Sequence, residues 1–404
     1  MDKSVTIALV GISGYGRNHV NRLLDKSVGQ NIQLVAAIDI HPDRCGRLQD
    51  LKDAGAKVYS SLEEFYGSGG RADLVIIASP IHFHAPQMLT ALKNGSSVLC
   101  EKPAAATIQD AIAMADAADT AGKLAAIGYQ WSYSTAIQAL KRDAIDGVFG
   151  NPIRMKTFIS WPRPESYYRD RHWAAKIKSE DGAWILDSPV HNATAHYLHN
   201  CLYILGKTPQ TSAMPVDVQA ELYRANPVEN YDTAALRTHT EEGVEILFFV
   251  SHAVPSNIGP VAFYEFENAT VVHEQQGIGA FFARFKDGRT KNYGRPDDAG
   301  DRKLWTTVAA VREGNKPLCD VRAAIPQLLC VNGAQESTEI ANFPHRMVRK
   351  QEMRSGNVTV VNGLQDVFLQ CFNLGILPNE YGIVPWAQES RVISLRNYTH
   401  FPSQ

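Results

Sequence analysis

A glycine-rich loop near the start of the chain is the feature that most constrains its fold. Residues 5–10 form an apolar run that predicts a strand, and residues 16–26 carry Val20, Leu23 and Leu24 at the spacing of one helix face. Between them lies Gly-Ile-Ser-Gly-Tyr-Gly, residues 11–16. A strand, a tight glycine turn and a helix make the first part of a β-α-β unit, from which parallel sheets are built.

The same alternation continues as far as residue 128. Short apolar runs at 34–38, 74–78, 98–100 and 124–127 predict further strands, each preceded by a helical or turn segment. One intervening helix is well marked, because Thr107 and Asp110 resemble a capping box at its start and Gly122 stands where the chain leaves it. We therefore predict an α/β domain with a parallel sheet over residues 1–128.

The pattern changes after residue 128. Period-two alternation over residues 153–161, 216–223, 233–240, 244–251 and 261–267 predicts an antiparallel sheet. A long helix, from about residue 187 to 205, interrupts these strands, and residues 289–301, rich in Gly, Asp and Arg, predict a mobile surface loop. Because 404 residues exceed what one hydrophobic core serves, we predict a second domain over residues 129–404.

Composition excludes several classes of partner. The chain is 45% hydrophobic and 20% charged, with a formal net charge of −2 and interspersed signs, so no field favours nucleic acid or an anionic membrane. No stretch approaches membrane-spanning length, and the N-terminus lacks the features of a signal peptide. Six scattered cysteines without a Cys-x-x-Cys pair indicate buried thiols in a reducing compartment. We expect a cytoplasmic protein.

The glycine loop predicts a dinucleotide site. Its glycines permit a tight turn and let backbone N–H groups and the helix N-terminus approach a pyrophosphate, although glycines also simply make turns. Asp39 ends the second predicted strand, where ribose hydroxyls need an acceptor, and its charge repels a 2′-phosphate, which favours NAD over NADP. Arg44 either swings toward such a phosphate or is a solvated helix residue. We assign to the loop's cofactor site Gly11, Ser13, Gly14, Tyr15 and Gly16.

Glu101-Lys102-Pro103 follows the apolar run at residues 97–100. In an open parallel sheet, ligands bind outside the carboxyl ends of the strands, so Lys102 stands where a bound nicotinamide should lie. Pro103 stiffens the turn and removes a backbone donor. The alternative is that the tripeptide is an ordinary surface turn.

Asp187 and His191 form a second candidate pair at the start of the predicted long helix. Residues four apart share a helix face, and a histidine can accept a proton at neutral pH while a carboxylate orients it. The alternative is that Asp187 caps the helix and His191 is an interior residue. His196 and His199 do not share one face with His191, so we predict no metal site.

An aromatic and basic cluster precedes this helix, in residues 161–164 and 167–173. Aromatic faces and forked guanidinium donors suit a polyhydroxylated ring or an anionic group on it. A packed aromatic cluster with solvated arginines is the alternative. We assign to the substrate site Trp161, Arg163, Tyr168, Arg171 and Trp173.

Taken in order, these motifs resemble the Gfo/Idh/MocA oxidoreductase family, which includes glucose-fructose oxidoreductase and inositol dehydrogenases. The resemblance covers most of the chain. It implies an N-terminal Rossmann dinucleotide-binding domain plus a C-terminal α+β domain, whose largely antiparallel open sheet often forms a dimer or tetramer interface. The motifs that carry it are residues 11–16, Asp39, residues 79–84, residues 101–103, residues 147–150, and Asp187 with His191.

Carried over by position, the resemblance implies that Lys102 contacts the reacting hydroxyl, that His191 is the acid/base and that Asp187 assists it. The chain departs from the family pattern in three places. Ile81 replaces the usual asparagine, Ser132 stands where an arginine is common, and Thr194 replaces an acid. The resemblance further assigns to the cofactor site Ser79, Pro80, His84, Glu101, Lys102 and Gln130.

We therefore predict an NAD-dependent oxidoreductase that transfers hydride between the nicotinamide and a secondary hydroxyl of a sugar, sugar derivative or cyclitol. We expect it to form a homodimer or homotetramer. Two alternatives stay open: an NAD-dependent glycoside hydrolase that recycles its bound cofactor, and a non-catalytic nucleotide-sensing protein. A dehydrogenase makes net NADH, the hydrolase makes none, and the sensing protein turns nothing over.

Overall fold

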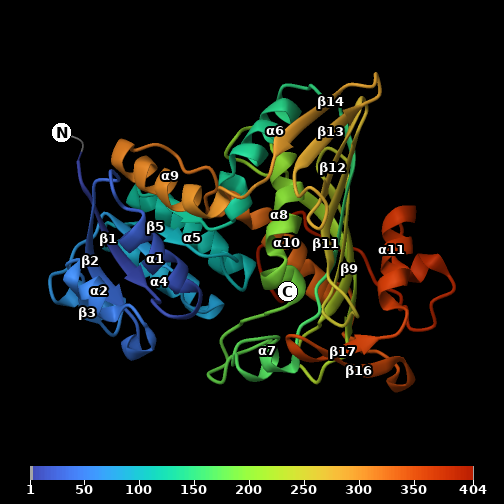
Figure 1. The fold of residues 1–404 in the computed structure, drawn as a ribbon, viewed down its shortest axis with the longest axis horizontal. Coiled ribbons are helices and arrows are strands. Elements are labelled where there is room, and N and C mark those ends of the chain that lie inside the picture. Colours follow the sequence, from blue (N-terminus) through green and yellow to red (C-terminus); the bar gives the residue numbers. More distant parts are fainter. Residues whose placement is uncertain (1–2, 404) are drawn as a thin grey trace. The chain divides into compact units, whose positions relative to one another are not determined.

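The computed structural model describes residues 3–403, which form two compact units (Figure 1). Unit 1 consists of the residues up to Ala105, Gln109–Ser134 and Asp298–Ile325. Unit 2 consists of Ala106–Ile108, Thr135–Asp297 and the residues from Pro326 onward. The observed division differs from the single boundary predicted at residue 128, because a segment far along the chain returns to the first unit.

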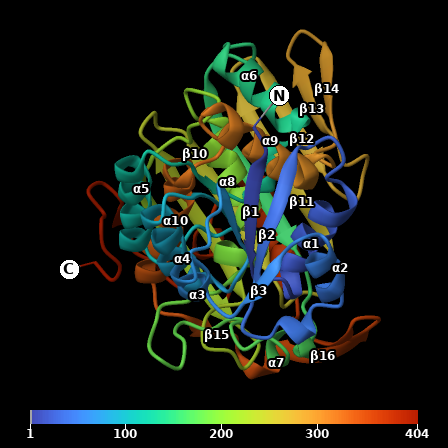
Figure 2. The same ribbon diagram turned by 90° about the vertical axis from the view of Figure 1, so that its left-hand side faces the viewer.

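Unit 1 is built on a six-stranded parallel sheet with the order β3-β2-β1-β4-β5-β6. The order reverses between β1 and β4, and such a switch point is where open α/β sheets bind ligands. Figure 2 shows α1 and α2 on one side of β1 and β2, and α4 and α5 on the other. The strands are β1 (Val5–Val10), β2 (Ile32–Ile38), β3 (Lys57–Tyr59), β4 (Leu74–Ile77), β5 (Ser97–Cys100) and β6 (Ala125–Ile127). The helices are α1 (Arg17–Asp25), α2 (Leu48–Asp53), α3 (Leu62–Gly67), α4 (His84–Lys93), α5 (Ile108–Ala121) and α9 (Ala299–Glu313).

The returning segment completes unit 1. Leu304 and Val308 of α9 are buried in the same core cluster as the apolar residues of β1, β2 and β4. Beyond α9, the Cys319 carbonyl accepts a hydrogen bond of 2.9 Å from the Ile127 N–H and so covers the edge of β6. An uncovered edge strand invites pairing with other chains, so this contact protects the sheet as well as extending the core.

The prediction of a mobile loop over residues 289–301 was wrong. Thr290–Gly294 is the strand β14, and α9 begins at Ala299. This strand lies at one end of the second sheet, and its residues are exposed or half-buried. Because neither face of the strand is buried, its sequence does not alternate between apolar and polar residues and gives no strand signal.

Unit 2 contains a ten-stranded sheet that confirms the predicted α+β class. Its order is β14-β13-β12-β11-β7-β10-β9-β8-β15, with β18 also paired to β8, and most neighbouring strands are antiparallel. The pairs β7–β10 and β8–β15 are parallel. The strands are β7 (Pro152–Ser160), β8 (Pro215–Arg224), β9 (Thr233–Thr240), β10 (Glu245–Ser251), β11 (Ile258–Phe266), β12 (Ala269–Glu274), β13 (Phe281–Phe285), β14, β15 (Ala341–Asn342) and β18 (Ile393–Ser394).

Helices cover both faces of this sheet (Figure 1). On one face, the Thr157 hydroxyl of β7 lies 3.4 Å from the Cys201 sulfur of α8 (Ala195–Ile204). On the other, Phe158 of β7 packs with Phe368 and Phe372 of α11 (Leu364–Leu374). Side chains alternate between faces along a strand, so adjacent residues of β7 meet different helices. The remaining elements are α6 (Thr135–Ile145), α7 (Glu165–Arg169), α10 (Val321–Ser337), and the hairpin of β16 (Val348–Met353) and β17 (Gly356–Val361).

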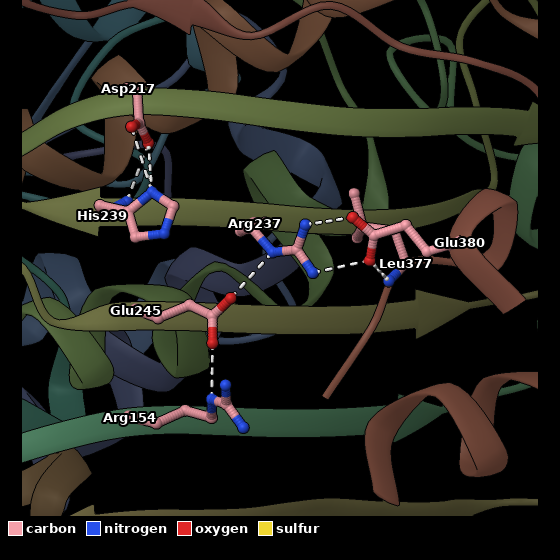
Figure 3. A network of polar contacts seen from close by, with 7 residues as sticks. All are labelled: Arg154, Asp217, Arg237, His239, Glu245, Leu377 and Glu380. Atoms are coloured by element: carbon pink, nitrogen blue, oxygen red, sulfur yellow. Dashed lines mark hydrogen bonds and ion pairs between the residues drawn. The ribbon is translucent and has the colours of Figure 1, made fainter. Parts of the chain in front are cut away.

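A polar network fixes the segment after α11 to the sheet (Figure 3). Arg237 of β9 pairs with Glu380 through two N···O contacts of 2.5 and 2.7 Å, and its Nε lies 2.9 Å from Glu245 of β10. Arg154 of β7 pairs with the same Glu245 at 2.5 Å. Opposite charges on neighbouring strands stabilise a sheet modestly, and here they also attach the C-terminal part of the chain. Part of this sheet face is therefore covered by the chain itself.

The six cysteines are all buried and form no disulfide. Across residues 3–403, no helix combines the length and the apolar character needed to cross a membrane.

Candidate active site

The glycine loop joins β1 to α1 where the backbone passes close to the end of β4. Gly11 has a φ of +78°, and a Cβ added there would lie 2.9 Å from the backbone of Ala78. A Cβ on Gly16 would lie 1.8 Å from the Gly11 carbonyl oxygen. Side chains are therefore excluded at two of the three predicted glycines, which leaves the backbone and the α1 N-terminus open to a pyrophosphate. This part of unit 1 fits a dinucleotide.

Asp39 follows β2 and holds the glycine loop in place. Its Oδ2 accepts hydrogen bonds from the Ile12 N–H at 3.0 Å and the Ser13 hydroxyl at 3.2 Å, and its Oδ1 accepts one from the His41 N–H at 2.9 Å. A carboxylate has about four acceptor positions, so Asp39 can also receive a ribose hydroxyl. Arg44 ends the turn Pro42–Arg44 with an exposed side chain.

Glu101, directly after β5, lies in a buried ion pair. Its Oε1 contacts His19 of α1 at 2.8 Å and also the ammonium of Lys303 of α9. Burial alone would raise the pKa of Glu101, but the Lys303 charge and the His19 hydrogen bond outweigh it and hold the pKa well below its usual range. Lys303 also lies 5.5 Å from the ring centroid of the half-exposed Tyr15. Glu101 thus anchors the turn that carries Lys102, and its predicted contact with the cofactor stays a prediction.

His84 links the turns that follow β4 and β5. Its Nδ1 lies 2.7 Å from the Pro103 carbonyl oxygen, and its Nε2 lies 2.9 Å from that of Ser79. Burial lowers the pKa of His84. The Ser79 hydroxyl donates to Gln87 at 2.6 Å. These contacts fix the two strand ends beside the half-buried Lys102.

The remaining cofactor candidates lie on short turns at the same edge of the sheet. Pro80 precedes the turn Ile81–Phe83, and Gln130 opens the turn that follows β6. Ile81, which differs from the asparagine that the resemblance implies there, is buried. Ser132 is likewise buried.

Asp187 and His191 lie in unit 2, on a segment that begins differently from the prediction. A π-helical turn over Pro189–Ala193 precedes α8, and its cap is Ser188, whose hydroxyl oxygen accepts from the His191 N–H at 3.1 Å. The Asp187 carboxylate accepts hydrogen bonds from the Ala175 N–H at 2.6 Å and the Asn192 amide at 2.7 Å. The alternative that Asp187 caps the helix is therefore not observed, because Ser188 is the cap.

The His191 ring is completely buried, and its tautomer follows from one contact. Its Nδ1 lies 2.9 Å from the Leu186 carbonyl oxygen. A carbonyl oxygen only accepts, so Nδ1 carries the hydrogen and Nε2 is the basic nitrogen of the neutral ring. We expected Asp187 to orient the His191 ring, but the group that contacts Nδ1 is the backbone carbonyl of Leu186.

Two unusual backbone conformations create these contacts. Ala175 has a φ of 53° and presents its N–H to Asp187, and Leu186 has a φ of 51° and presents its carbonyl to His191. A residue with a side chain rarely adopts a positive φ, and such strain gathers at functional sites. Neither position carries a sequence signal, since both residues ordinarily occupy helices and strands.

The predicted aromatic and basic residues gather around Tyr167, which we had not assigned. The guanidinium carbons of Arg163 and Arg171 lie 5.0 and 4.6 Å from its ring centroid. The rings of Tyr168 and Trp173 meet it edge-on at 5.2 and 6.4 Å. Trp161 joins the cluster through Arg163, at 5.8 Å. All five predicted substrate residues of this region therefore belong to one cluster.

A small cavity lies beside this cluster. It has a volume of about 10 Å³, enough for about one water molecule, and is lined by residues that include Tyr167, Tyr168, Asp187 and His252. The His252 Nδ1 lies 2.8 Å from the Trp161 carbonyl oxygen, so its Nε2 is the basic nitrogen. Burial, with the charge of Arg163, lowers the pKa of His252 to about 3, so the ring is neutral. Sequence reasoning missed His252, which is far away along the chain.

The other histidines of α8 are not arranged as metal ligands. Within the described part of the chain, no three His, Cys, Asp or Glu side chains are grouped to hold a metal ion. His199 stacks on Tyr203 with 5.5 Å between ring centroids, and burial lowers its pKa to about 3. The Thr194 hydroxyl donates to the Pro189 carbonyl at 2.8 Å.

Comparison with known proteins bears on unit 1 first. Residues 5–129 match the model of an oxidoreductase family with an NAD-binding Rossmann fold, the Gfo/Idh/MocA family. The matched range runs from β1 to the turn after β6 and includes the glycine loop, Asp39 and Glu101-Lys102-Pro103.

Curated relatives are similar over part of the chain. Inositol 2-dehydrogenase of Rubrobacter xylanophilus is 32% identical over 202 residues, 50% of this chain and 52% of the relative. Inositol 2-dehydrogenase 3 of Saccharopolyspora erythraea is 27% identical over 47% of this chain and 56% of the relative. Glucose-6-phosphate 3-dehydrogenase of Bacillus subtilis is 29% identical over 37% and 41%. The chain spans about half the length of the curated relatives it matches.

The likeness in structure extends over both units. The WlbA dehydrogenase from Bordetella pertussis, solved with NADH and UDP-GlcNAcA, has a TM-score of 0.68 and 22% identity, covering 83% of this chain and 97% of that protein. At this identity the likeness shows a shared fold. Unit 1 is thus an NAD-binding Rossmann fold. Residues 5–129 of unit 1 thus resemble the Gfo/Idh/MocA oxidoreductase family, as the motifs indicated.

Proposed function

We propose that this protein is an NAD(P)-dependent oxidoreductase acting on a secondary hydroxyl of a sugar, sugar derivative or cyclitol. The match of residues 5–129 to an NAD-binding oxidoreductase family supports the cofactor, and the acceptor geometry of Asp39 favours NAD over NADP. Bound NAD supplies the hydride acceptor. The names of the relatives, inositol 2-dehydrogenase and glucose-6-phosphate 3-dehydrogenase, support a polyhydroxylated substrate.

The observation that carries the catalytic part of the proposal is the fixed tautomer of His191. Its Nδ1–H is held by the Leu186 carbonyl, so Nε2 takes up the hydroxyl proton as the substrate is oxidised and returns it in the reverse direction. Proton uptake makes the ring cationic, and the nearby Asp187 carboxylate stabilises that charge. Asp187 is itself held by Ala175 and Asn192, so it acts as a positioning residue.

Lys102 supplies the second catalytic group in the proposal. It stands directly after β5, where ligands of a Rossmann fold bind, and it is half-buried. A cation there stabilises the negative charge that develops on the substrate oxygen as the proton leaves. The buried ion pair of Glu101 and the contact of His84 with Pro103 keep its turn in position.

The test is a screen at the absorbance of NADH, with purified protein, added NAD and a panel of sugars, amino sugars, sugar acids and inositols. Net NADH is the expected result. Product from a glycoside without net NADH would support the cofactor-recycling hydrolase instead. Binding of NAD without turnover of any compound would contradict the proposed enzyme and favour a nucleotide-sensing protein.

We also propose a cytoplasmic location and a homodimer or homotetramer. Six buried cysteines without a disulfide are typical of a reducing compartment. The family resemblance supports an oligomer, which light scattering of the purified protein measures directly. A monomeric mass would contradict the proposed oligomer. The C-terminal segment, which packs on one face of the sheet, would then explain why that face does not bind a second copy.

A further inference from the structure

Two arginines of unit 2 share one aromatic ring. Arg163 follows β7, and Arg171 follows α7, and their guanidinium carbons lie 5.0 and 4.6 Å from the centroid of Tyr167. Like charges repel, so two cations placed around one ring need a reason. The attraction of each cation for the ring face offsets part of that cost.

No carboxylate partner neutralises these two arginines. Across residues 3–403, neither Arg163 nor Arg171 forms an ion pair. The acids of the same region are already paired with other cations: Asp170 with Arg169, Glu229 with Lys176, and Glu165 with Lys350.

The guanidinium donors are also largely unused. The Arg163 Nε is buried and has no hydrogen-bond acceptor among the described residues. The Arg171 side chain makes one hydrogen bond, of 3.3 Å, to the Tyr167 carbonyl. A buried donor without a partner is unfavourable, and a guanidinium offers a planar fork that matches the two oxygens of an anionic group.

The arginine pair adjoins the segment that carries the proposed acid/base. The backbone N–H of Arg163 donates to the His252 carbonyl at 3.2 Å. Tyr167 and His252 line the small cavity together with Asp187 and Ser188. Asp187 already accepts hydrogen bonds from Ala175 and Asn192. Arg163 and the exposed Arg171 therefore lie close to this segment and lack an ion pair among residues 3–403.

We propose that Arg163 and Arg171 bind an oxyanion of the substrate, a carboxylate or a phosphate substituent on the sugar ring. This inference rests on the proposed function, because it names the class of sugar that the same site accepts. The fork geometry of both arginines holds the anion, and the aromatic faces of Tyr167 and Trp161 contact the ring.

Calorimetry on the NAD-loaded full chain tests the inference without requiring turnover. The probes are D-glucuronate, D-glucose 6-phosphate and D-glucose. At least one anionic sugar is expected to bind about tenfold or more tightly than glucose, and the better of the two distinguishes carboxylate from phosphate. Glucose binding as tightly as both anions, or no binding of either anion, would overturn the inference.

Variants separate anion binding from a structural role. Arg163→Met and Arg171→Met are each expected to lower the affinity for the anionic probe about tenfold to a hundredfold and to leave the affinity for glucose little changed. Arg169→Met is the matched control, because Arg169 lies in the same segment and is exposed like Arg171, but is paired with Asp170. Equal losses for glucose and for the anion would assign the arginines to packing alone.

Charge-preserving variants keep the test decisive if a methionine variant fails to fold. Arg163→Lys and Arg171→Lys retain the positive charge but lose the fork, so the anionic probe should weaken by less than in the methionine variants. A loss of NAD affinity in these variants would indicate damage to the fold. Anion preference in a protein that makes no NADH from any sugar would support this inference and contradict the proposed oxidoreductase, so the two can fail separately.

Discussion

The candidate functional residues of unit 1 and those of unit 2 are assembled in different ways. In unit 1 the functional groups stand at the ends of successive parallel strands: the glycine loop after β1, Asp39 after β2, Ser79 after β4 and Lys102 after β5. In unit 2 they come from three separate stretches, around residues 161–173, 186–192 and 230–252. A β-α-β unit brings strand ends to one edge by topology alone, whereas the unit 2 cluster exists only after irregular segments have folded onto a sheet.

Charge shows the same contrast. The buried carboxylate of Glu101 is neutralised inside unit 1 by Lys303 and His19. The guanidinium groups of Arg163 and Arg171 have no such partner among the described residues of unit 2. A buried charge paired within the fold serves structure, and a charge left unpaired beside a candidate site is available to a ligand.

The largest effect is expected from His191→Asn. Without the base, kcat on the substrate found in the screen should fall about a hundredfold to ten-thousandfold. NAD affinity should be unchanged, because the dinucleotide site belongs to unit 1. Steady-state kinetics and calorimetric titration with NAD measure the two quantities. A parallel loss of NAD affinity would contradict the assignment of cofactor binding to unit 1 alone.

Removing one partner of the buried ion pair should mainly destabilise unit 1. Lys303→Met leaves the Glu101 carboxylate buried with less compensation and should cost about 3–5 kcal/mol in urea unfolding. The double variant Glu101→Gln with Lys303→Met should lose less than the two single variants added together. Additive losses would show that the two groups do not interact.

The pH dependence of that ion pair has a definite sign. The pKa of Glu101 is lower in the folded state than its ordinary value of about 4.5, so its stabilising contribution is complete above that pH. The contribution is lost as the pH falls toward the lower folded value. The stability difference between the unaltered protein and Glu101→Gln should therefore narrow on acidification from about pH 6 to pH 3. A constant difference would contradict this linkage.

Gly16→Ala tests whether the loop backbone forms the cofactor cradle. A Cβ would lie 1.8 Å from the Gly11 carbonyl oxygen, so the loop must shift, and NAD affinity should fall about tenfold or more. Gly46→Ala is the control, because a Cβ there meets nothing within 4 Å. If both variants bind NAD as the unaltered protein does, the loop is a simple turn.

The smallest effect concerns the strained backbone in unit 2. Glycine adopts a positive φ without penalty, so Ala175→Gly should retain stability or gain up to about 1 kcal/mol. Ala174→Gly, the adjacent buried alanine without a positive φ, should lose about 0.5–1 kcal/mol. Thermal unfolding of both variants measures the difference. Equal losses would show that the conformation of Ala175 stores no strain.

Local patterns predicted five of the six strands of unit 1, missing the short edge strand β3, and the five central strands of unit 2, with small errors at their ends. They failed for the exposed strand β14, which has no buried face to produce an apolar pattern. They also failed for α9, a segment far along the chain that packs into the core of unit 1. The same rule governs the site. Asp39 and Lys102 were predictable because they stand next to recognisable strands, while Lys303 and His252 carry no local signal.

The sequence by itself determined the Rossmann fold of unit 1 and indicated the candidate residues beside its strands, because glycine turns and strand ends are encoded in adjacent residues. Only the tertiary structure decided which groups contact the candidate residues and hold them in position. It paired Glu101 with Lys303, gave the His191 Nδ1 a backbone carbonyl, and placed two unpaired arginines around Tyr167. The reason is physical: the state of a buried charge or imidazole depends on its neighbours in space, and the chain brings those together from positions far apart.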